Sequence, residues 1–345
     1  MQNLSLAATL PQAAPDGGAM FDGIYFGLPF EDYLADPALG STALRELRKN
    51  PTTYWHNSPM NPKRVVKKTS YLDRGTAMHT MLLEGEGAFT ATYLRGAPRT
   101  DDMTPAEKGA LTKAEKTRAA GLGMLALPAE DYDRILEVRE VIKDNAEIAG
   151  CFVNGIHEVS VFWKRDGVRR KARLDYLKPN GVGDLKSVSN TYGRDFVECC
   201  RMAIRNWDYH LQAAHYIEAR SKIRAYANAG LVHGPHDAAL FKRIADNPGL
   251  GWQWVFVCAE GAPDTYSISL TTDNPILEDA RIDLEIGVSR YVKYMRRFGT
   301  ERWRLIRSVE ELIWDDMPGY FARRTIEESA EYDEWMAEKE SGRYQ

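Results

Sequence analysis

The sequence predicts an α/β protein in which a central mixed β-sheet is flanked by helices, with a helical N-terminal part. Helical periodicity dominates the chain before Gly150. Three alternating, β-rich stretches joined by tight turns then follow one another directly. A helix, a strand hairpin and another helix complete the chain, and this order is typical of a sheet whose faces are covered by helices.

Caps and apolar spacing predict the N-terminal helices. Ser41 or Thr42 is a suitable N-cap for a helix that Pro51 should end or redirect. Further helices are expected over residues 72–84 and 128–147, where apolar side chains recur on one face.

The β-rich middle of the chain is expected to form a three-strand meander. Strands are predicted over 157–164, 168–177 and 182–188, with turns at Arg165-Asp166-Gly167 and Pro179-Asn180-Gly181. After the meander we expect a long helix, a hairpin of two strands and a last helix, over residues 195–225, 252–258 with 265–270, and 275–298.

Charge is distributed unevenly along the chain. The net charge of the 345 residues is −4, which by itself argues against a nucleic-acid partner. Residues 308–345 carry 11 acidic and 4 basic residues, a net charge of −7, so the rest of the chain has a net charge of +3. A mildly basic body with an acidic C-terminal segment permits DNA binding.

One large domain is expected over residues 21–307, between a flexible N-terminal arm of residues 1–20 and the acidic segment of residues 308–345. Within the domain, residues 100–125 are charged and rich in alanine, so either a helix or a mobile insertion fits them. No apolar run approaches the ~20 residues that span a bilayer. The arm lacks the basic residues that begin a secretory signal, so we expect a cytoplasmic protein without a membrane partner.

The four cysteines predict no metal framework. They are Cys151, Cys199, Cys200 and Cys258, and no two of them form a CxxC pair. Reduced thiols are therefore expected rather than disulfides or a zinc site.

Two aspartates and a lysine form the candidate catalytic group. Asp184 and Lys186 point to the same face of one predicted strand because side chains alternate along a strand. Asp175 lies on the preceding strand, and an antiparallel pairing can bring it beside Asp184. Adjacent carboxylates repel each other unless a cation lies between them, and hard oxygen ligands suit Mg²⁺ or Mn²⁺. This chemistry predicts metal-assisted hydrolysis of a phosphodiester.

Such a trio also arises often by chance, and for the trio alone an ordinary ion pair on a surface hairpin is the better explanation. Three further features favour the nuclease interpretation. His79 follows Gly75 on a predicted helix, and Gln212 and Tyr216 share a face of the long helix, four residues apart. The third feature is their order around the aspartates and the lysine.

This ordered set resembles the RecB-like branch of the PD-(D/E)XK nuclease superfamily, and within it the RecE-type exonucleases (exonuclease VIII). The resemblance extends over roughly residues 21–300. It includes the segments 23–25, 51–55, 74–79, 173–175, 183–187 and 209–216, with Tyr33, Ser41, Leu44, Leu47, Leu83 and Glu84. The individual motifs are short, and their order and spacing are the specific part.

The resemblance implies a PD-(D/E)XK nuclease core and a role for each matching position. Asp175, Asp184, the main-chain carbonyl of Leu185 and His79 would hold the metal. Lys186 would be the catalytic lysine.

Outside this group, the resemblance implies that Gln212 and Tyr216 order the site or contact DNA near the phosphate. Arg45, Arg48 and Lys49 would contact phosphates around the DNA end. Glu84 and Glu158 could each bind a second metal, but a surface or structural carboxylate is the favoured interpretation of both.

The activity implied is that of a double-strand DNA exonuclease, working 5′ to 3′ and leaving 3′ single strands for recombination by annealing. One alternative is an endonuclease or the nuclease subunit of a helicase–nuclease complex. A second alternative is a non-catalytic DNA-binding protein with this fold, which the intact lysine disfavours.

The resemblance also implies the cofactor and the partners. The cofactor would be Mg²⁺, with Mn²⁺ as a substitute. The cysteine positions do not fit the iron–sulfur cluster of some relatives, and the sequence has no GxxxxGK[ST] motif for a nucleotide. The partners would be DNA ends, a RecT-like annealing protein and further copies of the chain in a ring, in a bacterial host with the gene on a phage or prophage.

Overall fold

The computed structural model describes residues 19–65, 70–190, 192–247 and 249–305, together with 316, 330, 332–334 and 336–337. The chain divides into two compact units, Met1–Trp303 and Arg304–Gln345, and every element below belongs to the first. The expected N-terminal arm before Ala19 and nearly all of the acidic segment lie outside the described residues.

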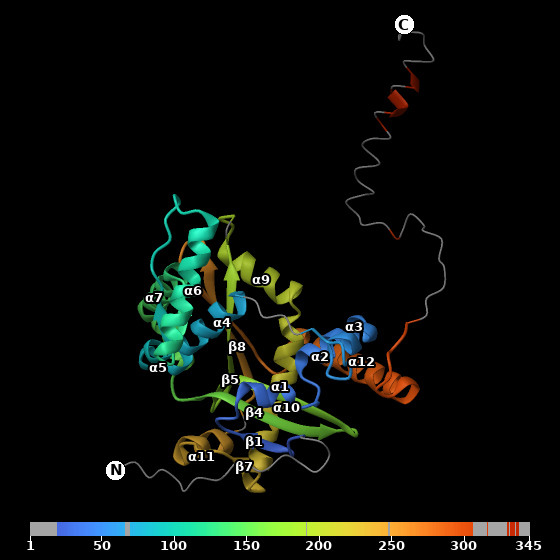
Figure 1. The fold of residues 1–345 in the computed structure, drawn as a ribbon. Coiled ribbons are helices and arrows are strands. Elements are labelled where there is room, and N and C mark those ends of the chain that lie inside the picture. The colour runs from blue at the N-terminus through green and yellow to red at the C-terminus, as the bar shows by residue number, and fades with distance from the viewer. Residues whose placement is uncertain are drawn as a thin grey trace. The chain divides into compact units, whose positions relative to one another are not determined.

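A seven-stranded mixed sheet runs through the first unit in the order β7-β1-β4-β5-β6-β8-β9 (Figure 1). Its central pairs are antiparallel, except that β6 and β8 run parallel. The strands are β1 (Gly23–Tyr25), β4 (Ile156–Arg165), β5 (Val168–Lys178), β6 (Gly181–Ser189), β7 (Val232–His233), β8 (Gly251–Glu260) and β9 (Thr265–Leu270). The predicted fold class is confirmed, and the five strands that the sequence predicts all form.

Helices cover both faces of this sheet, and a separate pair of short strands, β2 (Tyr93–Arg95) and β3 (Leu125–Leu127), lies outside it. The helices are α1 (Phe30–Ala35), α2 (Ser41–Lys49), α3 (Pro51–Asn57), α4 (Ser70–His79), α5 (Glu86–Thr92), α6 (Pro105–Gly121), α7 (Ala129–Asp144), α8 (Ala146–Ala149), α9 (Phe196–Asn206), α10 (Tyr209–Asn228), α11 (Ala238–Asp246) and α12 (Pro275–Phe298). A π-helical turn over Thr80–Glu84 follows α4, and a 3₁₀ turn over Gly150–Phe152 follows α8.

Two hydrophobic cores lie on opposite faces of the sheet. One core joins the sheet to α2, α9, α10 and α12, and it includes Val182 of β6. The other joins the sheet to α4 and α7, and it includes Leu185 of β6. Because neighbouring side chains of a strand point to opposite faces, β6 contributes to both cores.

The predicted long helix over residues 195–225 is wrong in one respect, because it is two helices. α9 ends at Asn206, and α10 begins at Tyr209. Asp208 between them has φ 51° and ψ 41°, in the left-handed region that interrupts a helix. Its carboxylate pairs with the Lys49 ammonium, and Arg45 donates to the carbonyl of Trp207 at 2.6 Å. Contacts from α2 therefore support the break.

Other segments follow the chain's local signals. Pro51 redirects the chain, since it is the first residue of α3 with Asn50 as its N-cap. Residues 105–121 are helical, and Thr104 and Glu107 form a capping box at their start. The strands β1 and β7 were not predicted, because two or three residues carry no recognisable alternation.

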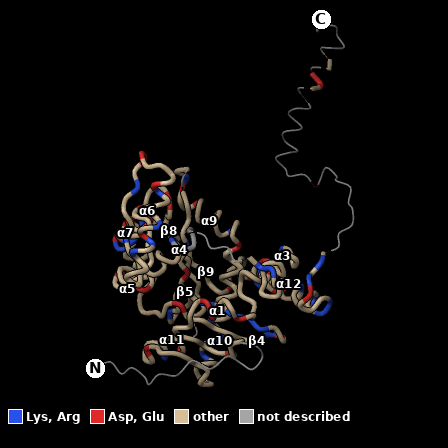
Figure 2. The backbone as a smooth tube through the Cα atoms, viewed as in Figure 1, with Lys and Arg blue, Asp and Glu red and all other residues tan. Residues whose placement is uncertain are grey.

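Charged residues lie on the helices around the sheet, and basic residues gather along the C-terminal part of α12 (Figure 2). Lys293, Arg296 and Arg297 line a shallow hollow there. The sequence analysis did not single out this group, because it lies in an ordinary amphipathic helix.

The contact between α12 and α2 depends on a glycine. A Cβ atom at Gly287 would lie 2.7 Å from the main-chain oxygen of Leu44. We expect Gly287→Ala to lower the free energy of unfolding by about 1–3 kcal/mol through overpacking. Gly109→Ala is the control: its Cβ would meet nothing within 4 Å, so it should raise stability by about 0.5–1 kcal/mol. Urea denaturation measures both, and equal effects would contradict the packing argument.

Candidate active site

β5 and β6 separate at the point where the two predicted aspartates lie. Their ladder ends at the pair Tyr176 and Gly183, so Asp175 and Asp184 are the next residues in register. The Asp175 carboxylate instead accepts a hydrogen bond from the main-chain N–H of Leu185 at 3.1 Å. The side chain of Asp175 thus replaces a ladder bond and brings the two carboxylates together, as the sequence analysis predicts.

Lys186 lies against Asp184, as expected for two residues on one face of a strand. Its Nζ is 2.6 Å from Asp184 Oδ2, and Asp184 is fully buried. The lysine ammonium also lies over the ring of Tyr209, 5.0 Å from the centroid. The Lys186 ammonium therefore contacts both the buried Asp184 carboxylate and the Tyr209 ring.

The second carboxylate oxygen of Asp184 has its hydrogen-bond partner on α10. Gln212 Nε2 donates to Asp184 Oδ1 at 3.2 Å. Tyr216 lies one turn further along the same helix face and shares a hydrogen bond with Gln212. Gln212 therefore links the buried Tyr216 to the carboxylate.

His79 approaches from the opposite face of the sheet, at the end of α4. Its Nε2 is 3.9 Å from Asp175 Oδ2, and its ring donates a hydrogen bond to the carbonyl of Leu185. The π-helical turn Thr80–Glu84 begins directly after it, and such turns are frequent at functional sites. The structure thus brings together all of the catalytic and metal candidates that the sequence predicts.

Glu158 also belongs to this cluster. Its Oε1 is 4.0 Å from His79 Nδ1, and its other oxygen pairs with Arg173. It lies opposite Asp175 in the register of β4 and β5 and has φ 56°, which is unusual for a residue inside a strand. The sequence left its role open, because a glutamate within a strand carries no signal of such a backbone.

The remaining candidates lie elsewhere. Glu84 is exposed at the end of the π-helical turn. Arg48 Nε is 2.6 Å from Asp283 Oδ1 of α12. Arg45 and Lys49 contact the break between α9 and α10, as described above. The three cations of α2 thus have partners within the protein, and their contact with phosphates stays a prediction.

Burial sets the electrostatics of the site. Loss of solvent raises the pKa of Asp184 to about 7 and that of Asp175 to about 6, and Lys186 opposes both shifts. Burial alone would lower the pKa of Lys186, but the two carboxylates raise it above its usual value. The pKa of His79 is lowered by burial and then by Lys186. At neutral pH the site therefore holds a cationic lysine and a neutral imidazole.

The donors present fit a hard divalent metal. Asp184 Oδ2 is buried and has no aligned hydrogen bond, although the Lys186 ammonium lies 2.6 Å away as an ion-pair partner. The 3.9 Å between His79 and Asp175 is less than two ~2.1 Å ligand bonds to Mg²⁺. Among the described residues no three His, Cys, Asp or Glu side chains are already arranged as ligands. Asp175, Asp184, His79 and the Leu185 carbonyl would hold the ion after side-chain rotation.

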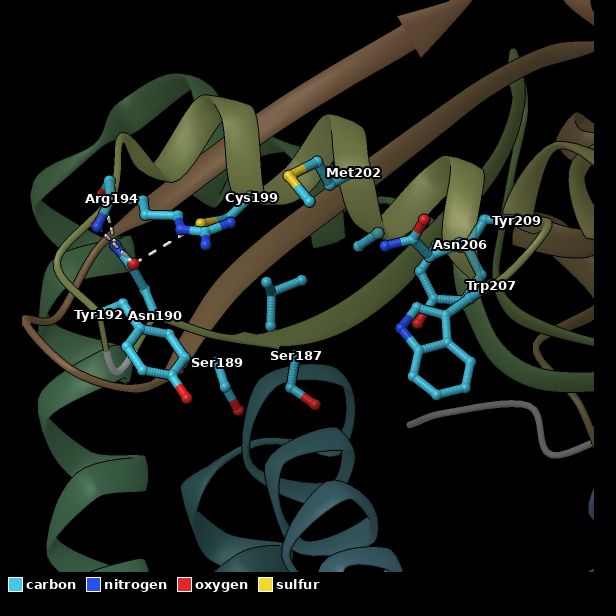
Figure 3. A pocket seen from close by; sticks show the side chains of 12 residues that line it. Ser187, Ser189, Asn190, Tyr192, Arg194, Cys199, Met202, Asn206, Trp207 and Tyr209 are labelled. Carbon is cyan, nitrogen blue, oxygen red and sulfur yellow. Dashed lines mark hydrogen bonds between the residues drawn. The ribbon is translucent and has the colours of Figure 1, made fainter. Parts of the chain in front are cut away.

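Two hollows adjoin the cluster. One, of about 480 Å³, lies between the end of β6 and α9 (Figure 3). The other, of about 180 Å³, lies between α2 and α10 and is lined by Gln212 and Tyr216. Trp207 and Tyr209 line both hollows.

Comparison with known proteins identifies the family of the chain. A family model described as a PDDEXK-like domain of unknown function (DUF3799) matches residues 41–230. The chain belongs to this family. A solved structure described as a "Putative exonuclease" from Eubacterium rectale has 15% sequence identity and a TM-score of 0.49, over 78% of this chain and 86% of that chain. No curated protein matches the chain.

The match to the PDDEXK-like family confirms the predicted PD-(D/E)XK resemblance, and the roles of the three central residues stay a prediction. The span 41–230 includes β5, β6 and α10, which carry Asp175, Asp184, Lys186 and Gln212. The closer likeness to RecE-type exonucleases stays a prediction at this point.

Two carboxylates around one lysine leave an excess of buried negative charge, which Asp175→Asn would remove. The amide oxygen can still accept from Leu185. In EDTA at pH 8 we expect the free energy of unfolding of this variant to exceed that of the wild type by on the order of 2 kcal/mol. The variant should therefore unfold at a higher temperature. Added Mg²⁺ or Mn²⁺ should stabilise the wild type only. Asp184→Asn is the comparison, because it leaves Lys186 without its closest partner and should not stabilise. A variant that still gains stability from metal would contradict the ligand assignment.

The raised pKa values of Asp175 and Asp184 predict a pH dependence with a definite sign. A carboxyl whose folded pKa exceeds its unfolded value stabilises the metal-free protein at low pH, and this stability is lost as pH rises from about 4 to about 7. Metal binding needs the ionised form, so metal affinity should fall below about pH 7, by roughly tenfold per pH unit for each proton displaced. Melting with and without Mn²⁺ at several pH values measures this, and a metal-induced shift independent of pH would refute it.

Proposed function

We propose that this protein is a metal-dependent deoxyribonuclease that degrades double-stranded DNA from its ends. The observation that carries the proposal is the buried group of Asp175, Asp184 and Lys186, joined by Gln212, at the point where β5 and β6 separate. Alternation along β6 alone would explain an ion pair between Asp184 and Lys186. It would not account for a second carboxylate, a histidine from the other face and an amide from a third element.

The chemistry would be hydrolysis of a phosphodiester. A bound divalent ion would polarise the phosphate and lower the pKa of an attacking water. Lys186 is cationic at neutral pH, so its role is to orient that water and to stabilise the charge that develops on the phosphate, rather than to remove a proton. Gln212 holds the Asp184 carboxylate in orientation, and Tyr216 fixes Gln212.

Two further observations support DNA as the substrate. The hollow formed by Lys293, Arg296 and Arg297 on α12 offers positive charge for phosphates, independent of sequence. The likeness of residues 21–55 and 74–79 to RecE-type exonucleases supports attack at DNA ends in the 5′ to 3′ direction. On the same likeness we propose recombination as the process, a RecT-like annealing partner and assembly with further copies.

The location of the protein is proposed on the same basis. No helix among the described residues is long and apolar enough to cross a membrane. A phage- or prophage-encoded protein in the cytoplasm of a bacterial host agrees with the RecE-type likeness.

Loss of the lysine should strongly reduce activity. We expect Lys186→Ala to reduce Mg²⁺-dependent degradation of linear duplex by at least about 100-fold. Lys164→Ala is the matched control, because Lys164 is an exposed lysine two strands away on β4. End-labelled linear duplex, with Mg²⁺ or with EDTA, reports rate, metal need and polarity in one experiment.

The same experiment separates the alternatives. Degradation of closed circular duplex at the rate of linear duplex would indicate an endonuclease. Full activity in EDTA, or in the Lys186→Ala variant, would contradict the proposed mechanism. Binding of DNA without any cleavage, with Mg²⁺ or Mn²⁺, would favour a non-catalytic protein.

A further inference from the structure

The 480 Å³ hollow beside Lys186 has no role in the mechanism above. It lies within the range of about 300–1,000 Å³ that is typical of ligand sites. Its lining includes Ser187, which follows the catalytic lysine, and Tyr209, whose ring the lysine covers. The hollow therefore adjoins the candidate active site at Ser187 and Tyr209.

The floor of the hollow is an edge of β6. The N–H and C=O groups of successive strand residues alternate between the two edges. Leu185 directs both groups toward the β5 side, where they contact Asp175 and His79. Ser187 and Ser189 direct theirs to the same side by alternation, and no strand in the described part of the chain pairs with them there. Main-chain N–H groups in such a position bind phosphate oxygens.

Aromatic rings stand at the two ends of this edge. Figure 3 shows Tyr192 at one end and Trp207 at the other, with Ser187 and Ser189 between them. Tyr192 is 87% exposed and Trp207 is 60% exposed, which leaves their ring faces available for stacking. The Arg194 guanidinium lies 5.9 Å from the centre of the Tyr192 ring and adds a positive charge. Aromatic faces and positive charge along a groove are the features by which proteins hold single strands.

Trp207 is held in place by its main chain. Arg45 donates to its carbonyl, and the left-handed Asp208 that follows is paired with Lys49. The ring also separates the hollow from the smaller one beside Gln212. Its exposure is therefore a consequence of how α2 contacts the helix break.

We propose that the hollow binds a short unpaired segment of a DNA strand next to the phosphate to be cleaved. Its bases stack on Trp207 and Tyr192, and its phosphates contact the free edge of β6 and Arg194. This inference rests on the proposed function and specifies the form of DNA that the site accepts. Bases within a duplex are already stacked on each other, so the rings select a strand that has separated from its complement.

Binding of a fluorescent oligo-dT in EDTA tests this without any cleavage. Fluorescence anisotropy should show that Trp207→Ala and Tyr192→Ala each weaken binding by roughly tenfold. Trp207→Phe should retain most of the affinity, because a phenyl ring still stacks. Phe21→Ala is the control, since Phe21 is 49% exposed and precedes β1, three strands from β6. Arg194→Ala should reduce the slope of log affinity against log salt by about 1.

The outcomes separate this inference from the proposed function. Wild-type affinity in both aromatic-to-alanine variants would overturn the inference, even if the protein degrades DNA. Ring-dependent binding by a protein that never cleaves DNA would support a site for an unpaired strand in the hollow and overturn the proposed function. Tighter binding of oligo-rU than of oligo-dT would overturn the assignment to DNA.

Discussion

The structure of the site depends on the burial of Asp184. A carboxylate without solvent is stable only when its oxygens have partners, because an unpaired buried charge lowers the stability of the fold by several kcal/mol. Lys186 and Gln212 fill this need, one from the same strand and one from α10. Asp175 works against it by adding a second negative charge, and burial and repulsion together keep the pKa of Asp184 near 7. The residues around Asp184 are thus determined by its charge.

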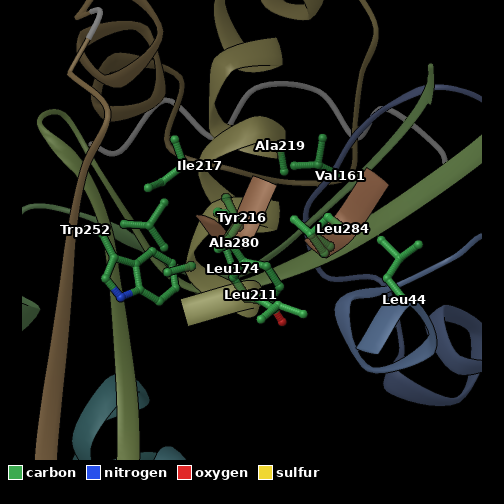
Figure 4. Packing of buried hydrophobic residues seen from close by; sticks show 14 of the residues in the cluster. Leu44, Val161, Leu174, Leu211, Tyr216, Ile217, Ala219, Trp252, Ala280 and Leu284 are labelled. Atoms are coloured by element: carbon green, nitrogen blue, oxygen red, sulfur yellow. The ribbon is translucent and has the colours of Figure 1, made fainter. Parts of the chain in front are cut away.

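Strand alternation explains how distant segments meet at this carboxylate. The even-numbered residues of β6 face the core that contains α10, where Tyr216 packs among the residues shown in Figure 4. The odd-numbered residues face the core that contains α4 and α7. Gln212 contacts Asp184 from the face that carries α10, and His79 contacts the main chain of Leu185 from the face that carries α4. A sheet with helices on both faces is therefore a condition for the site, and its two cores position the two helices.

The dependence of the site on strand alternation also explains which features could be predicted from the sequence. The facing of Asp175 and Asp184 was predictable, because the short turn at Asn180-Gly181 fixes the register of β5 and β6. The strands were found to within two residues at each end, since alternation is a local signal. The break at Asp208 was not predicted, because helix-forming residues lie on both sides of Asn206-Trp207-Asp208 and the contacts that support the break come from α2. Local sequence patterns therefore predict helices, strands and strand register. An unusual backbone conformation that contacts from a distant segment stabilise is visible only in the folded structure.

One residue with a strained backbone lies next to the candidate site. Among the described residues, Asn154, Glu158, Asp166 and Asp208 have positive φ without being glycine. Asp166 lies in a hairpin turn and Asn154 precedes a strand, where such angles are ordinary. Asp208 lies in the turn between α9 and α10, directly after the residue that caps α9, where a left-handed residue is also common. Glu158 has no turn to explain its angle and lies next to the candidate site, and such a residue costs about 1–3 kcal/mol, in the same direction as the buried carboxylates. A bound cation would relieve the carboxylate part of this penalty, so metal affinity and folding stability would be thermodynamically linked.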